Sequence, residues 1–94
     1  MTFTFIVEFR GGTYCSQIES DSVISALPKW IDKLKSDKSE IKYLGDKVLD
    51  RIENAISEES NRPIKLKGLK NVWFTMLTSN QGTFSINIVQ TESK

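Results

Sequence analysis

The chain opens with alternating apolar and polar residues over positions 2–10. The apolar positions are Phe3, Phe5, Val7 and Phe9. A period of two that is rich in aromatic and β-branched residues indicates a half-buried strand. Gly11–Gly12 then favours a tight turn into a returning strand over 13–19. With these two glycines as the loop, we expect Phe9 to face Tyr14 and Glu8 to lie beside Cys15.

Two stretches in the middle of the chain repeat at the period of a helix. In 20–35 one stripe, at about 100° per residue, holds Val23, Ala26, Leu27, Trp30, Ile31 and Leu34. Because this stripe keeps its phase across Pro28, we expect one kinked helix. In 41–56 a second stripe holds Ile41, Leu44, Val48, Ile52 and Ala55. Gly45 interrupts it, and we favour a new helix capped by Asp46 over one helix that runs through the glycine.

The last third of the chain is strand-like. A short alternating piece over 64–67 ends at Gly68, and 72–78 and 83–91 flank a turn sequence over 79–82. A three-residue loop would place on one face Val72, Phe74, Met76, Phe84, Ile86 and Ile88. A loop of even length would instead place Trp73, Thr75 and Leu77 there. The first register buries more apolar area, so we expect it.

These elements predict an α+β protein with a single domain over 1–94. An antiparallel sheet of about four strands, made of two hairpins, packs on one face against two helices in the order ββααββ. The length of 94 residues and the 38% apolar and 27% charged shares are ordinary for one globular domain.

Composition removes most familiar catalytic chemistry. The chain has no histidine, one cysteine and a net charge of +1, which excludes serine and cysteine catalysis through histidine and nearly every zinc site. Asp46, Asp50 and Glu53 form a column on the polar face of the second helix, a pattern that can hold a divalent cation. A solvated helix face explains the same pattern more simply. We therefore expect no enzyme activity, no cofactor and no metal.

The residues expected on the outer face of the sheet point to a partner. In the favoured register Trp73 faces Val89 there, with Leu77 on the same strand and Ile6 on the first hairpin. Aromatic anchors dominate the energetics of interfaces. We therefore expect a small non-enzymatic protein-interaction module, such as an inhibitor, an immunity protein or an antitoxin-like partner of another macromolecule. The partner is another protein or a second copy of the chain, as in a homodimer, and the four residues named here form the contact.

A basic segment provides the alternative. Arg62, Lys65, Lys67 and Lys70 have no acidic residue among them, and Trp73 follows closely. Single-strand binders combine such cations with aromatic side chains, so the alternative is a nucleic-acid-associated protein. We favour it less because lysines on an edge strand also guard against aggregation.

The apolar start is too short to span a membrane, because Glu8 and Arg10 interrupt it. No basic residue precedes it, as a signal peptide would require. We expect a cytoplasmic protein with no membrane partner.

Overall fold

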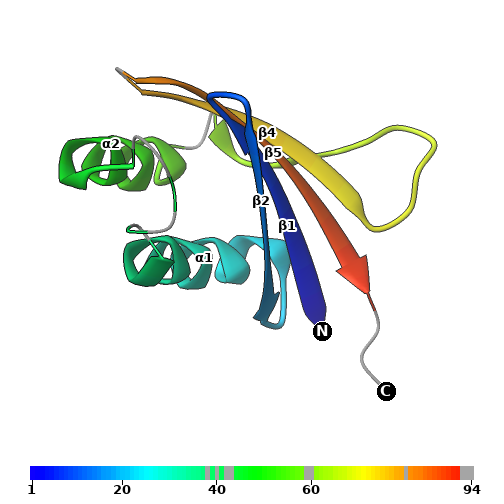
Figure 1. Ribbon diagram of the computed structural model, residues 1–94. Coiled ribbons are helices and arrows are strands. Elements are labelled where there is room, and N and C mark those ends of the chain that lie inside the picture. The colour runs from blue at the N-terminus through cyan, green and yellow to red at the C-terminus, as the bar shows by residue number, and fades with distance from the viewer. Residues whose placement is uncertain (38, 40, 42–43, 59–60, 80, 92–94) are drawn as a thin grey trace.

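The computed structural model describes residues 1–37, 39, 41, 44–58, 61–79 and 81–91. Its elements are β1 (Thr2–Phe9), β2 (Gly12–Glu19), α1 (Val23–Asp37), α2 (Asp46–Ile56), β3 (Ile64–Lys65), β4 (Val72–Ser79) and β5 (Gly82–Thr91). The strands form one antiparallel sheet in the order β2-β1-β5-β4-β3. Both helices lie on the same side of this sheet (Figure 1).

The predicted α+β class, with an antiparallel sheet and two helices, is confirmed. The sheet has five strands rather than about four, because Ile64–Lys65 pairs with β4 as a short edge strand. The element order is therefore ββααβββ. The last strand, β5, lies between β1 and β4, so pairing between β1 and β5 joins the two hairpins.

The loop of the first hairpin lies one residue earlier than expected, so the pairing register is shifted by two residues. Phe9 pairs with Gly12, so the loop is Arg10–Gly11, whose φ angles are +48° and +81°. The expected Gly11–Gly12 loop is wrong, and Cys15 lies beside Ile6 rather than Glu8. In this register the Tyr14 ring lies over Gly12, and a Cβ on Gly12 would be 2.5 Å from the Tyr14 hydroxyl oxygen. Because the shift is two residues, every side chain keeps its predicted face.

The second hairpin has the even-length loop, so the favoured register is wrong. Ser79 pairs with Gly82, and Leu77 then faces Phe84. A loop with an even number of residues puts Trp73, Thr75 and Leu77 on the core side, and Phe74 and Met76 on the outer side. The polar residues on the core side keep their hydrogen bonds, which is why the arrangement is tolerated. The Thr75 hydroxyl donates to the carbonyl of Asn61 at 2.7 Å, and the Ser79 hydroxyl donates to that of Gly82 at 2.8 Å.

The core lies between the sheet and the helices. Both predicted helical stripes face it, and the largest buried side chain is Trp30, with 0% exposure. Its ring stacks on that of Phe5, with ring centroids 5.3 Å apart and planes 10° from parallel. Phe9 and Phe84 stack at 4.0 Å at the other end of the sheet.

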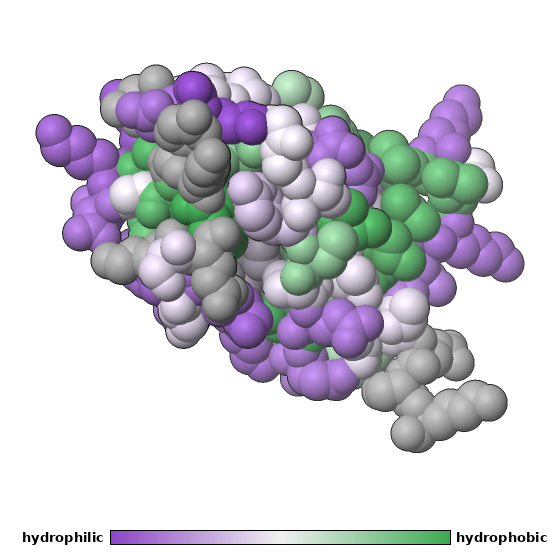
Figure 2. Space-filling model, in the orientation of Figure 1, coloured by the Kyte–Doolittle hydropathy of each residue, from purple (hydrophilic) through white to green (hydrophobic). Residues whose placement is uncertain are grey.

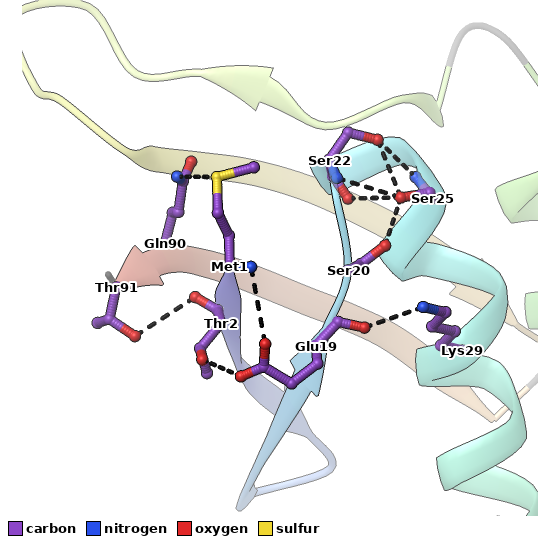
Figure 3. Close-up of polar contacts among 9 residues, drawn as sticks. All are labelled: Met1, Thr2, Glu19, Ser20, Ser22, Ser25, Lys29, Gln90 and Thr91. Carbon is purple, nitrogen blue, oxygen red and sulfur yellow. Dashed lines mark hydrogen bonds and ion pairs between the residues drawn. The ribbon is translucent and has the colours of Figure 1, made fainter. Parts of the chain in front are cut away.

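The two helices begin differently. At α1 the Ser22 hydroxyl accepts from the Ser25 N–H at 3.1 Å, while the Ser25 hydroxyl accepts from the Ser22 N–H at 3.2 Å. This reciprocal arrangement is a capping box with serine at the third position (Figure 3). Helix α1 then continues through Pro28. Helix α2 begins at Asp46, as favoured from the sequence, but Gly45 rather than Asp46 occupies the N-cap position.

Polar contacts tie three strands and α1 together at the N-terminal end (Figure 3). The Met1 ammonium lies 3.6 Å from the Glu19 carboxylate, to which the Thr2 hydroxyl also donates. Lys29 Nζ donates to the Glu19 carbonyl at 3.0 Å, and the Thr91 hydroxyl donates to the Thr2 carbonyl at 3.3 Å. Among the described residues, no helix is long and apolar enough to cross a membrane.

Candidate protein-interaction surface

The sheet has an outer face, opposite α1 and α2, that the rest of the described chain leaves uncovered (Figure 1). Strand pairing aligns a row of side chains across this face: Ile64, Phe74, Asn87, Ile6 and Cys15. The neighbouring rows add Val72 beside Val89, and Met76 beside Ser85. Apolar residues therefore gather on β3 and β4, and the face becomes more polar toward β2.

Two of the four residues predicted to contact a partner do not lie on this face. Leu77 is only 1% exposed and belongs to the core. Trp73 is half-buried and packs against the core, with its ring edge-on to that of Phe3 at 6.0 Å. The placement fails because the loop of the second hairpin is one residue shorter than assumed, which moves each residue of β4 to the other face. Ile6 and Val89 are on the outer face, and both are half-buried.

Phe74 takes the place that the sequence assigned to Trp73. It lies on the outer face directly between Ile64 and Asn87. Ile64 is 71% exposed and Met76 is 51% exposed, while Phe74 is half-buried. We call Ile64, Val72, Phe74, Met76 and Val89 the outer patch. Exposed apolar side chains grouped around an aromatic ring are typical of a protein contact.

Four cations lie in or near β3. Arg62, Lys65, Lys67 and Lys70 are all exposed, and none forms an ion pair with a described residue. They do not share one face, and Arg62 lies beside the two helices. Lys65 pairs with Trp73 and so belongs to the helix side, whereas Lys67 and Lys70 lie in the loop between β3 and β4. Figure 2 shows hydrophobic side chains at the end of the molecule where this loop lies (Figure 1), with long hydrophilic ones projecting around them.

The acidic column on α2 is exposed and partly neutralised. Glu53 accepts a hydrogen bond from Lys35 Nζ at 2.9 Å. This bond is the main cause that raises the pKa of Lys35 above its ordinary value. The described residues contain no group of three or more side chains able to hold a metal ion together. Asp46 and Asp50 are exposed on the same helix.

A cleft between the helices was not foreseen from the sequence. It has a volume of about 390 Å³ and is lined by apolar residues together with a few polar and charged ones: Ile24, Leu27, Pro28, Ile31, Asp32, Glu53, Ile56, Ser57 and Arg62. Ile24 is 44% exposed although it is a large apolar residue. The one indication of this cleft in the sequence is that Ile24 lies outside the buried stripe of α1. Arg62 thus reaches the helix side rather than joining the lysines of the β3–β4 loop.

Comparison with known proteins gives no assignment, because no family model, curated protein or solved structure matches the chain.

Proposed function

We propose that this protein is a small non-enzymatic module that binds another protein through the outer patch. The observation that supports this most strongly is the group of exposed apolar residues on β3 and β4, above all Ile64 and Met76. Burial of such side chains against a partner removes apolar surface from water, at roughly 25 cal/mol per Å². An inhibitor, an immunity protein or an antitoxin-like protein needs only a surface of this kind and no catalytic group.

The charges define the partner's chemistry. Residues 61–91 contain no acidic residue, and the four cations of this segment lack a described ion partner. A complementary protein surface therefore has an apolar centre, with carboxylates that face the β3–β4 loop and its Lys67 and Lys70. Cations at the edge of an interface mainly speed association, and this effect is weakened by salt.

The test compares two exposed isoleucines on opposite sides of the molecule, Ile64 at 71% and Ile24 at 44% exposure. Wild-type protein captures its partner from cells of the source organism, and the partner is then titrated with purified variants. We expect Ile64→Ser, in the outer patch, to weaken binding at least about tenfold. Ile24→Ser, in the cleft between the helices, makes the same chemical change and is expected to leave affinity unchanged. The opposite result would move the site to the cleft.

The second candidate function is association with nucleic acid, which is favoured by the four cations that form no ion pair with a described residue. Salt-titrated binding to single- and double-stranded oligonucleotides separates it from the first. Micromolar affinity that falls steeply with salt, and falls further when Lys67 and Lys70 become glutamine, would support this candidate. Binding weaker than about 100 μM at physiological salt would exclude it, because even non-specific binders reach that range.

A further inference from the structure

The two edges of the sheet are unequal. On one side β3 is only two residues long, follows Pro63 and carries Lys65. A short strand, a proline and a lysine are the usual devices that stop an edge from pairing with another chain. On the other side β2 is eight residues long, and β1 is its only neighbour among the described strands. No charged residue occurs between Gly12 and Ile18.

The alternation of β2 shows which of its backbone groups face outward. The Ser20 N–H donates to the Met1 carbonyl at 3.0 Å, so the even-numbered residues of β2 bond to β1. The carbonyl of Glu19 faces the other way, where it accepts from Lys29 Nζ. The N–H and C=O groups of Thr13, Cys15 and Gln17 therefore point away from the sheet, and all three residues are exposed.

We propose that two copies of this chain pair antiparallel through their β2 edges and form one continuous sheet. Only odd-numbered residues offer outward groups, so an odd residue must face an odd residue. The register with Cys15 opposite Cys15 of the second copy also places Thr13 opposite Gln17, twice. These three opposed pairs exchange about six backbone hydrogen bonds, and this is the one register in which Thr13, Cys15 and Gln17 all pair with one another.

The ends of β2 are compatible with the same register. Glu19 of one copy comes opposite Gly11 of the other, which has no side chain, so no like charges face each other at either end of the two-fold symmetric pair. The symmetry axis stands perpendicular to the sheet, so the helices of both copies lie on one side. The outer patches lie near the two far edges, since β3 and β2 are at opposite ends of the strand order. This pairing is independent of the proposed function.

Sedimentation velocity in the presence of reductant tests whether the edge pairs. We expect the wild type to be a dimer at about 100 μM, and Cys15→Lys to raise the dissociation constant at least about tenfold. The matched control is Thr78→Lys, which places the same charge at an exposed position on β4. A wild type that is monomeric up to about 1 mM would overturn the proposal. Equal effects of the two lysines, or no effect of either, would do the same.

Disulfide crosslinking tests the register without a charged substitution. Opposed residues in a hydrogen-bonded pair have Cα atoms about 5.5 Å apart, within the range of a disulfide. Added copper–phenanthroline in air accepts the two electrons, and the two thiols lose their protons. We expect wild-type Cys15 to crosslink to itself. In a Cys15→Ser background, Thr13→Cys and Gln17→Cys are expected to crosslink only when mixed, because like positions are about 13 Å apart. Crosslinking of either variant alone, or of neither the wild type nor the mixture, would refute the register.

Discussion

The sharpest test of the fold uses two neighbouring residues of β4. Leu77 is 1% exposed and faces Phe84 on the core side, whereas Met76 is 51% exposed on the outer face. Truncation of a buried leucine to alanine costs about 2–5 kcal/mol, through lost transfer energy and the cavity left behind. A domain of this size holds about 5–14 kcal/mol in total, at 0.05–0.15 kcal/mol per residue. Leu77→Ala is therefore expected to remove a large share of the stability.

Urea unfolding followed by circular dichroism measures both variants. With a slope of about 1.5 kcal/mol/M, the midpoint of Leu77→Ala is expected to fall by roughly 1–3 M. Met76→Ala is expected to change the free energy of unfolding by less than about 1 kcal/mol, as for other surface positions. The register of the second hairpin would be refuted if Met76→Ala were the more destabilising of the two.

Three further predictions concern the helices. Ser22→Ala removes the hydroxyl that caps α1 and is expected to cost about 1 kcal/mol, while Asp21→Ala, one residue earlier, costs less than half as much; equal losses in urea melts would contradict the capping box. Trp30→Phe keeps an aromatic ring against Phe5 and is expected to leave a folded but weakened protein, whereas Trp30→Ala costs about 3–5 kcal/mol; a thermal melt in which both variants matched the wild type would place this side chain outside the core. The raised pKa of Lys35 means that its ion pair with Glu53 stabilises the fold fully below the ordinary lysine pKa and less as pH rises through the raised value. The difference in melting temperature between wild type and Lys35→Met is therefore expected to shrink in strong alkali. A difference that grew with pH there would contradict this sign.

Local periodicity was sufficient for the elements and for most of the core. The stripe around Trp30 in α1 and the alternation of β1 each have a single buried face, so their assignment needs no tertiary knowledge. The first hairpin shows why: its loop lies one residue earlier than expected and its register is shifted by two, yet Val7 keeps its face because a strand repeats every two residues.

The second hairpin differs because its two faces are similar in sequence. Trp73 and Phe74 are both aromatic, and Met76 and Leu77 are both aliphatic. Only the number of loop residues, odd or even, decides which of these side chains face the core. The larger buried apolar area favoured the odd number, which is wrong. The outer face of β4 remained apolar, whereas Thr75 faces the core with its hydroxyl bonded to Asn61.

The candidate sites depend on arrangements that no local pattern contains. The long free edge of β2 follows from the strand order, in which β1 rather than β2 pairs with the second hairpin. The cleft beside Ile24 follows from how α1 and α2 pack on each other. The sequence shows the cations, but it does not show that Arg62 lies on the helix side, apart from the lysines of the β3–β4 loop.

Hydrogen–deuterium exchange of the protein with its captured partner tests the proposed binding surface most directly. The loop over 66–71 and strand β3 are exposed at the edge of the sheet, so their amides have the most protection to gain from a partner. We predict that exchange slows in 64–71, while the rates over 24–31 and 53–57 stay as in the free protein. Protection confined to these two helical segments, with 64–71 unchanged, would contradict binding through the outer patch.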